Sequence, residues 1–494
     1  MLFKSTRSNE KASKTAAEVI KQGLADDGGL FVPDSIPTIT DEEIVALCKD
    51  RYPVRAAKIL SKFLPDYTYE ELLKDCNAAY SEKSFVGGAA PLVKIHDNFH
   101  SLELWHGPTA AFKDMALQIM PRLLSRALVK TGEERTALIL VATSGDTGKA
   151  ALEGYKDVPK VKIMVYYPVD GVSRVQKLQM ATQTGSNVNV CAIRGNFDDA
   201  QNGVKEIFAN EATANELDQM GYFFSSANSI NWGRLAPQIV YYVSAYCDLI
   251  NMGTCKLGDS FNVCVPTGNF GNIFAAYLAK EMGLPIHHMV CASNTNNILT
   301  DFLRTGTYDR NRNFYLTMSP SMDILISSNL ERLLYFIAGS EKTAAYMKAL
   351  KETGRYTVDA EVLASIRAHF SGYYTDEKQT VATIHKTFEK HGYLADTHTA
   401  VAIHAAEAFV ADTADTRPMV IDSTASPYKF ANDVFFSVTG NAAKNELSAL
   451  DELSAATNTQ IPYPLSGLDQ REVRFTKVID REDMTKAVFD YLNA

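Results

Sequence analysis

Positive charge, long hydrophobic runs and paired cysteines are all scarce in this chain of 494 residues. It has 49 lysines and arginines against 58 aspartates and glutamates, so it lacks the basic face that nucleic-acid phosphates require. No run approaches the ~20 apolar residues of a membrane-spanning helix. The seven cysteines are scattered and form no Cys-x-x-Cys pair, which predicts free thiols and no metal centre. We therefore expect a protein that binds neither nucleic acid nor a membrane.

The first stretch of the chain also lacks the apolar core of a secretory signal peptide. Charged residues, among them Lys4, Arg7, Glu10 and Lys14, interrupt it throughout. Together with the unpaired cysteines, this pattern predicts a cytoplasmic protein.

From about residue 100 onwards, short β-rich runs alternate with helical patterns. The expected strands are 136–142, 161–167, 188–193, 262–266, 288–292 and 418–422, and the expected helices among them are 147–155, 173–184, 199–210 and 271–281. Such alternation predicts an α/β fold with parallel sheets covered by helices on both faces. In folds of this kind, ligands bind where strands end and helices begin.

A chain of this length needs more than one hydrophobic core, and we divide it into three regions. Residues 1–92 are predicted to be a mainly helical N-terminal region. Residues 93–440 are predicted to form the catalytic region, with two parallel-sheet domains of which the smaller spans roughly 136–235. Residues 441–494 are predicted to be a C-terminal appendage.

The most informative motif is His106-Gly-Pro-Thr-Ala-Ala-Phe-Lys-Asp114, which starts a helix predicted to run to about residue 128. A helix N-terminus and a closed site both disfavour an ammonium group. Lys113 is therefore pushed toward the neutral amine that forms Schiff bases with carbonyl compounds. A surface lysine beside an N-capping Asp114 is the alternative for an isolated lysine.

A second motif, Pro266-Thr-Gly-Asn-Phe-Gly-Asn272, joins a strand pattern to a helix pattern. Its glycines allow backbone N–H groups to approach an anion, and the following helix adds its positive end. The predicted phosphate-binding residues are Gly268, Asn269, Phe270, Gly271 and Asn272. Taken alone, the loop is also an ordinary glycine-containing turn.

Three further polar passages follow strand patterns, at residues 142–149, 225–238 and 422–430. Hydroxyl and amide groups at the start of a helix suit a substrate carboxylate, and cations suit a phosphoester dianion. The candidate substrate-binding residues are Thr143, Ser144, Thr147, Lys149, Ser226, Asn228 and Arg234. Capped structural helices are the alternative for the first two passages.

The lysine motif, the glycine loop and the N-terminal segment 22–33 resemble those of long-chain threonine synthases, and the resemblance covers most of the chain. These enzymes use pyridoxal 5'-phosphate and have the tryptophan-synthase-β fold (fold type II). The resemblance implies that the cofactor lies between the two sheet domains, with Lys113 as the Schiff-base lysine and the glycine loop around the cofactor phosphate. It also implies that Thr424 faces the pyridine nitrogen. Asp146 stands where most fold-type-II relatives have an asparagine beside the cofactor O3′, so its carboxylate must be neutralised there.

The family reaction converts O-phospho-L-homoserine and water to L-threonine and phosphate, with the freed Lys113 as general base at Cα and then at Cβ. A phospho-lyase of the same fold, which releases 2-oxobutyrate, is one alternative, and a catalytically silent relative is another. The resemblance implies a small-molecule substrate, and we expect a monomer or a homodimer.

Overall fold

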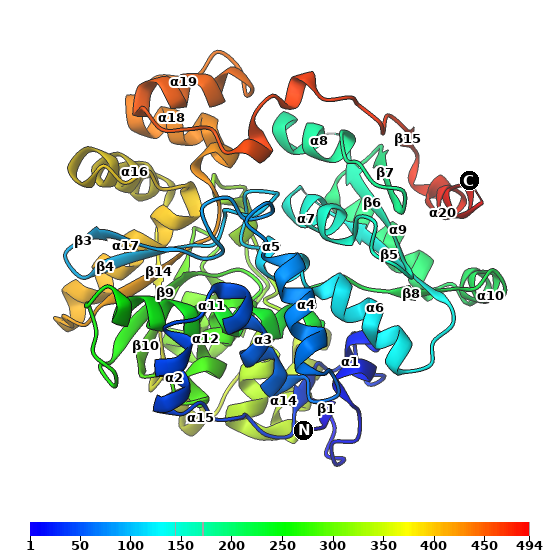
Figure 1. Cartoon of the computed structure of the whole chain (residues 1–494), viewed down its shortest axis with the longest axis horizontal. Coiled ribbons are helices and arrows are strands. Elements are labelled where there is room, and N and C mark those ends of the chain that lie inside the picture. The colour runs from blue at the N-terminus through cyan, green and yellow to red at the C-terminus, as the bar shows by residue number, and fades with distance from the viewer. Residues whose placement is uncertain (144, 170–171, 494) are drawn as a thin grey trace.

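Two large β-sheets organise the molecule, one with six strands and one with five, and they lie beside each other in Figure 1. The computed structural model describes the whole chain apart from residues 144, 170–171 and 494. Two-stranded ribbons are formed by β1 (Phe3–Ser5) with β2 (Phe31–Pro33), and by β11 (Thr307–Asp309) with β12 (Arg355–Thr357).

The larger sheet has the strand order β13-β10-β9-β14-β4-β3. Its strands are β3 (Leu92–His96), β4 (Phe99–Glu103), β9 (Phe261–Pro266), β10 (Ile286–Ser293), β13 (Phe370–Tyr374) and β14 (Met419–Ser423). All neighbours are parallel except β3 and β4. Only Asp97 and Asn98 connect these two strands, and a parallel crossover needs a dozen or more residues. The expected parallel pattern therefore ends at this hairpin, which the sequence analysis did not identify.

The smaller sheet has the order β15-β7-β6-β5-β8 and is parallel throughout. Its strands are β5 (Thr136–Ala142), β6 (Val161–Pro168), β7 (Val188–Ile193), β8 (Tyr222–Ser225) and β15 (Val478–Ile479). The edge strand β15 comes from the C-terminal region 441–494. That region therefore returns to complete the smaller sheet, and Figure 1 shows its red end beside β7.

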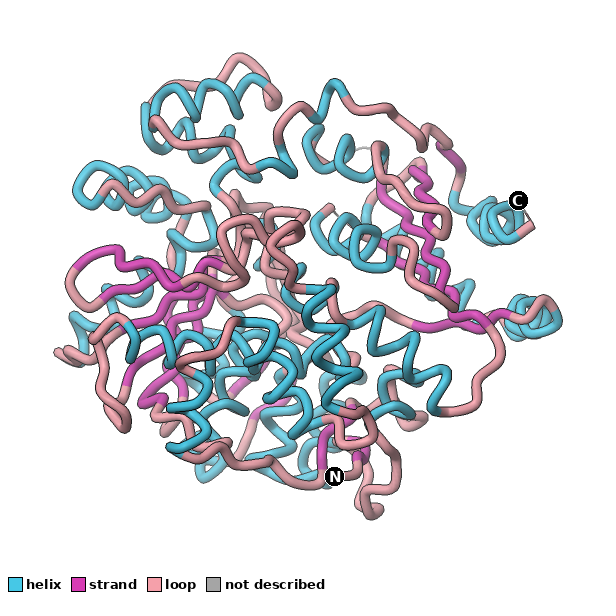
Figure 2. Tube along the Cα trace, in the orientation of Figure 1, coloured by secondary structure: helices cyan, strands magenta, loops and turns pink. Residues whose placement is uncertain are grey.

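Helices surround both sheets, as the cyan tubes of Figure 2 show. The N-terminal region contributes α1 (Ala16–Gln22), α2 (Asp41–Leu47), α3 (Tyr52–Phe63) and α4 (Tyr69–Ala79), in line with the helical pattern expected there. The middle of the chain contributes α5 (Asp114–Leu117), α6 (Met120–Lys130), α7 (Asp146–Tyr155), α8 (Arg174–Ala181), α9 (Phe197–Ala209), α10 (Glu211–Gln219), α11 (Trp232–Asn251) and α12 (Gly271–Glu281). The later helices are α13 (Ile298–Thr305), α14 (Leu330–Thr353), α15 (Ala360–Arg367), α16 (Glu377–His391), α17 (Thr397–Thr413), α18 (Ala431–Thr439), α19 (Ser448–Thr457) and α20 (Met484–Leu492). Among the residues that the structure describes, no helix is both long and apolar enough to cross a bilayer.

Reciprocal caps start three of the four N-terminal helices. Thr15, Thr40 and Thr68 each accept a hydrogen bond from a backbone N–H three residues later, and a glutamate at that position bonds back to the threonine N–H. The region then packs on α11, where the Trp232 ring lies 5.3 Å from the Phe3 ring and 5.8 Å from the Phe63 ring. The N-terminal region is therefore joined to the core through aromatic contacts.

The helix expected after Lys113 is divided in two. The short helix α5 ends at Leu117, and α6 begins at Met120 with Pro121 in its first turn. Helix α7 crosses α5 so closely that a Cβ atom on Gly154 would overlap the Leu117 carbonyl oxygen. This approach joins the smaller sheet, through α7, to the helix that follows Lys113.

We predict that Gly154→Ala lowers the free energy of unfolding by about 1–3 kcal/mol, because the added methyl group has to displace backbone atoms. Thermal unfolding of the cofactor-free protein measures the change. Gly203→Ala is the matched control, since its Cβ would meet the flexible thioether of Met484. Equal stability of the two variants would contradict the prediction.

Candidate active site

Lys113 lies at the N-cap of α5, in a loop that is bound to the loop after β14. The Phe112 N–H donates to the Thr424 carbonyl at 2.8 Å, and the Ser426 N–H donates to the Ala110 carbonyl at 3.0 Å. These bonds form a short antiparallel bridge between Ala111 and Ala425. Two motifs that are more than 300 residues apart in the sequence therefore form one wall of the site.

The side chain of Lys113 is 12% exposed, and its amine faces polar groups. Its Nζ lies 3.5 Å from the Ser321 hydroxyl and 3.9 Å from the Asp146 carboxylate. Burial lowers the pKa of Lys113 to about 8, with Asp146 acting in the opposite direction and Lys429 adding to the decrease. A substantial fraction of the neutral, nucleophilic amine is therefore present near neutral pH.

Asp146 begins α7 and is neutralised by a lysine that the sequence analysis did not select. The Lys429 ammonium, with a fully buried side chain, lies 3.0 Å from Asp146 Oδ1 and also donates to the Thr109 carbonyl at 2.8 Å. Burial alone would raise the pKa of Asp146, but the attraction of Lys429 and Lys113 lowers it below the usual value. Lys429 stands within the passage 422–430, close in sequence to the predicted site residue Thr424. This closeness was the signal in the sequence that could have identified it.

Ser321 and His398 were also missed. Ser321 is in the 3-10 helix η1 (Pro320–Met322), and its hydroxyl lies 3.3 Å from Asp146 Oδ2. Its N–H donates to His398 Nε2 at 3.1 Å, so the ring proton is on Nδ1, which donates to Asp396 at 3.0 Å. Nothing in the sequence around Ser321 predicts this, because η1 follows no strand and belongs to no recognisable motif.

The glycine loop lies at the carboxyl end of β9 and runs into α12. Among the residues that the structure describes, no acceptor is bonded to the five backbone N–H groups of residues 268–272. Four of these residues are buried, and Asn269 is exposed. Unused donors at the start of a helix form a site suited to a phosphate group.

The two glycines of this loop have different surroundings. A Cβ on Gly268 would lie 2.7 Å from the Ser321 carbonyl, so glycine is needed here because η1 lies against the loop. A Cβ on Gly271 would make only ordinary contacts of 3.4 Å with Asn329 and Gln238. The left-handed conformation belongs instead to Phe270, with φ 65°. Glycine at position 268 is therefore required by the close approach of η1, in addition to any approach of an anion.

Thr424 is buried and directly follows β14, and its carbonyl accepts from Phe112. One position before this strand end, Asp422 Oδ2 lies 2.7 Å from the Tyr242 hydroxyl, and the same hydroxyl lies 2.9 Å from the Asn272 carbonyl. Burial raises the pKa of Asp422 to about 8. A protonated Asp422 donates to the Tyr242 hydroxyl, which donates in turn to the Asn272 carbonyl, and this chain of three groups links the glycine loop to β14.

The candidate residues of the passage after β5 have different roles, and some of them only stabilise local structure. The Thr143 hydroxyl accepts from the N–H groups of Gly145 and Gly148, at 2.9 and 3.0 Å, and so shapes the turn. Ser144 lies outside the residues that the structure describes. Thr147 is partly exposed in the first turn of α7. Lys149 pairs with Glu153 at 3.1 Å and also bonds to Gln183, so its charge is already compensated and its predicted role in substrate binding loses support.

Arg234 has no such compensation. It is 6% exposed in the first turn of α11, and its Nη1 donates to the Ala227 carbonyl at 2.7 Å. Within the described part of the chain, no carboxylate lies within ion-pair distance of it. Burial lowers the pKa of Arg234 to about 10, and its charge is close enough to lower the pKa of Lys113.

The loop held by Arg234 contains the other two candidates of this passage. Ser226 and Asn228 flank Ala227, and the Ser226 hydroxyl accepts from the Asn228 N–H at 3.2 Å. Ser226 is half-buried and Asn228 is exposed. The structure thus places both beside the carbonyl that Arg234 binds, and the Ser226 side chain carries a local turn bond as well.

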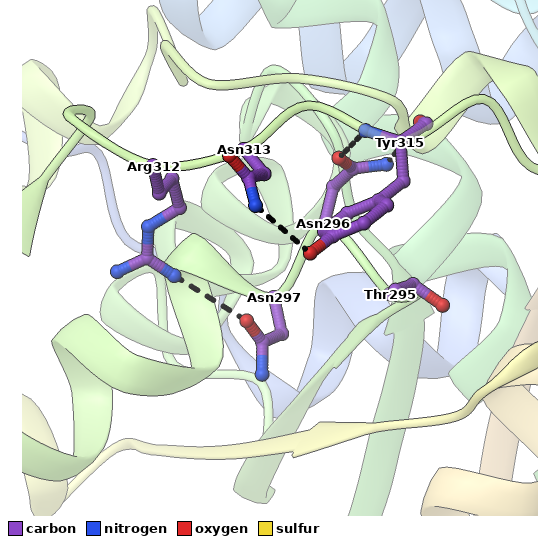
Figure 3. Close-up of a pocket in the computed structure, with 6 residues that line it drawn as sticks. All are labelled: Thr295, Asn296, Asn297, Arg312, Asn313 and Tyr315. Atoms are coloured by element: carbon purple, nitrogen blue, oxygen red, sulfur yellow. Dashed lines mark hydrogen bonds between the residues drawn. The ribbon is translucent and has the colours of Figure 1, made fainter.

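A separate polar cavity of about 410 Å³ lies beside the end of β10. Its lining consists of Thr295, Asn296, Asn297, Arg312, Asn313 and Tyr315, as Figure 3 shows. Arg312 pairs with Asp301 at 2.8 Å and donates to Asn297 at 3.3 Å. Because its cation is paired, this cavity is a weaker anion site than the surroundings of Lys113.

We predict that Lys113 reacts with an acylating reagent at lower pH than exposed lysines of the cofactor-free protein. Only the neutral amine reacts, and a pKa of about 8 makes half of Lys113 neutral near pH 8, against about 10.4 for an exposed lysine. Its labelling rate should therefore rise up to about pH 8 and then level off, as measured by mass spectrometry of the digest. Exposed lysines of the same digest are the reference, and a parallel rise of all lysines would contradict the prediction.

Three family models match the chain. They are the threonine synthase N terminus at residues 2–80, the pyridoxal-phosphate dependent enzymes at residues 86–421, and the C-terminal threonine synthase model at residues 399–488. The pyridoxal-phosphate model alone spans most of the chain and contains Lys113 and the glycine loop.

Known proteins match over similar lengths. The human protein named threonine synthase-like 1 is 38% identical over 85% of this chain, which spans 57% of that longer protein. A crystal structure of pyridoxal-phosphate-bound threonine synthase from Brucella melitensis has a TM-score of 0.88 and 36% identity, with each chain covered completely. Threonine synthase of Pseudomonas aeruginosa is 38% identical over 93% of this chain and 92% of its own. The chain therefore belongs to the threonine synthase family of pyridoxal-phosphate-dependent enzymes.

Proposed function

We propose that this chain converts O-phospho-L-homoserine and water to L-threonine and phosphate. The observation that carries the proposal is a surplus of buried cations near Lys113. Lys113 and Lys429 share the carboxylate of Asp146, and Arg234, which is close enough to lower the pKa of Lys113, has no carboxylate partner among the described residues. Buried cations need anionic partners. A cofactor phosphate and a phosphorylated amino-acid substrate supply them.

The residues present fit pyridoxal phosphate. Lys113 offers an amine with a lowered pKa, the glycine loop offers unused N–H donors, and Thr424 offers a buried hydroxyl at the end of β14. The charge of Asp146 is compensated by its ion pair with Lys429, which is the condition that the resemblance sets for a carboxylate at this position. When bound, the cofactor withdraws electrons from Cα of the substrate and so makes its proton acidic.

Lys113 is the residue that moves protons in the proposed reaction. As a neutral amine it accepts the Cα proton and later a Cβ proton, and a pKa of about 8 suits a base that must take up and release protons near neutral pH. The Ser321 hydroxyl accepts from the lysine amine and donates to Asp146, which orients the amine. Asp146 stays ionised and stabilises the lysine when it carries a proton.

Arg234 is the residue proposed to bind the substrate phosphate. It is a planar donor that can contact a phosphate in a forked manner, it is buried, and it lies in α11, outside the glycine loop itself. Its neighbours Ser226 and Asn228 can add hydrogen bonds. Thr143 and Thr147 remain candidates for the substrate carboxylate at the start of α7, together with Ser144.

Two alternatives use the same residues. A phospho-lyase would release 2-oxobutyrate because water does not add at Cβ, and a silent relative would bind without turnover. The match to the Pseudomonas threonine synthase over nearly its full length favours the first proposal. A cytoplasmic location, a monomeric or homodimeric state and the lack of nucleic-acid binding stay predictions from the cysteines, the resemblance and the net charge.

Product analysis tests the proposal directly. The holoenzyme is incubated with O-phospho-L-homoserine, and we expect equal amounts of threonine and phosphate. Release of 2-oxobutyrate and ammonia would instead identify a phospho-lyase, and no phosphate release would identify a silent relative. Lys113→Ala is the control, for which no turnover is expected.

We predict that Arg234→Ala raises KM for O-phospho-L-homoserine by roughly tenfold to a hundredfold, since a charged hydrogen bond contributes about 1.5–3 kcal/mol. The absorption spectrum of the bound cofactor should not change. Arg234→Lys should restore binding only in part, because the forked contact is lost. Steady-state kinetics gives the answer.

The matched control for this test is Arg417→Ala. Arg417 pairs with Asp415 at the amino end of β14, away from Lys113, and its loss should leave KM unchanged. An unchanged KM for Arg234→Ala, with the protein folded and loaded with cofactor, would remove Arg234 from the substrate site.

A further inference from the structure

The back of the glycine loop is held by the segment 327–332, which we call the backing segment. The Ser327 hydroxyl donates to the Gly268 carbonyl at 2.6 Å. The Asn329 backbone N–H and side-chain amide both donate to the Asn269 carbonyl, at 2.9 and 3.1 Å. Two consecutive carbonyl groups of the loop therefore point toward the backing segment.

The orientation of these carbonyls determines where the loop N–H groups point. In a trans peptide unit, the C=O and the following N–H point in opposite directions. Holding the Gly268 and Asn269 carbonyls at the back therefore directs the N–H groups of Asn269 and Phe270 away from it. These are two of the donors that have no acceptor among the described residues. The backing segment thus keeps the loop in its donating arrangement.

Arg332 supports this arrangement with a buried charge. Its side chain is fully buried, and it donates to Asn329 Oδ1, to the Phe31 carbonyl at 3.0 Å and to the Ile230 carbonyl at 2.6 Å. Both ends of the Asn329 amide are therefore bonded, so this side chain has one orientation. Within the described residues, no carboxylate forms an ion pair with Arg332, and its positive charge adds to the attraction for an anion at the loop.

The N-terminal segment 3–33 contacts the same helix turn. Glu331 accepts bonds from the Thr6 hydroxyl at 2.6 Å and from two nitrogens of Arg7, each at 2.8 Å. Arg332 binds the Phe31 carbonyl in β2. Thr6, Glu331 and Arg332 are all buried, so these bonds are shielded from water. The first turn of α14 is thereby connected to the N-terminal ribbon on one side and to the glycine loop on the other.

We propose that Ser327, Asn329 and Arg332 are positioning residues for the cofactor phosphate, and that the N-terminal segment 3–33 strengthens cofactor binding through Glu331 and Arg332. The backing segment acts on the phosphate alone, because its bonds orient only the loop that receives the phosphate. This holds whichever product the enzyme releases.

The test compares two ligands of the cofactor-free protein, pyridoxal phosphate and pyridoxal, which lacks the phosphate. Absorbance titration gives the dissociation constant of each. We expect Ser327→Ala and Asn329→Ala to weaken pyridoxal phosphate binding about tenfold, the size of one or two lost hydrogen bonds, and to leave pyridoxal binding unchanged. Arg7→Gln should have the same selectivity with a smaller effect of about threefold, because it acts through Glu331.

The matched control is Ser371→Ala, since Ser371 bonds to His288 in another part of the larger sheet, at 2.8 Å. Equal weakening of both ligands in the Ser327 and Asn329 variants would show a merely structural role and overturn the proposal, as would no weakening of either. If Arg7→Gln leaves the ratio of the two dissociation constants unchanged, the proposed contribution of the N-terminal segment 3–33 is overturned. If Asn329→Ala does not fold, Ser327→Ala decides, because it leaves every bond of Arg332 in place.

Discussion

The ionised carboxylate of Asp146, held between two lysines, is the interaction on which the site depends. Asp146 comes from the smaller sheet, whereas Lys113 and Lys429 come from loops joined to the larger one. A buried carboxylate is costly without partners, and the two ammonium groups supply the compensation. The same carboxylate tempers the decrease in the pKa of Lys113, so that the lysine can both hold and release a proton near neutral pH. The same electrostatic arrangement therefore joins the two sheet domains and sets the pKa of Lys113, the proposed Schiff-base lysine.

Close packing of backbone segments completes the site around this cluster. The segment η1 lies directly against Gly268 and brings the Ser321 hydroxyl between Lys113 and Asp146, while His398 holds its backbone. On another side, the Gly268 and Asn269 carbonyls are bonded to residues that start α14. The glycine loop is thus shaped by segments 50 to 60 residues further along the chain, and its donors are oriented before a ligand arrives.

The local pattern of apolar and polar residues predicted the longer helices and strands well. It failed for elements that are too short to show such a pattern. The strands β5 and β7 and the helix α12 begin and end where apolar runs, glycines and charges indicate. The hairpin of β3 and β4 was missed because both strands are short and partly polar. Strand β15 was missed because a strand of two residues shows no hydrophobic periodicity. The division between α5 and α6 was missed although Pro121 signals it, because proline has no N–H to bond to the Leu117 carbonyl and so ends the first helix there.

The sequence by itself determined the chemistry: a lysine before a helix, a glycine loop between strand and helix, and polar turns after buried strands. These follow from residue type and local spacing, so they can be read without coordinates. Only the tertiary structure decided which charges meet. It brought Gln183 to Lys149, left Arg234 without a carboxylate among the described residues, and brought Lys429 and Ser321 to Asp146. The physical reason is that the pKa of a buried group and the partner of its charge depend on neighbours that are distant in sequence. Local spacing along the chain does not show which residues those neighbours are.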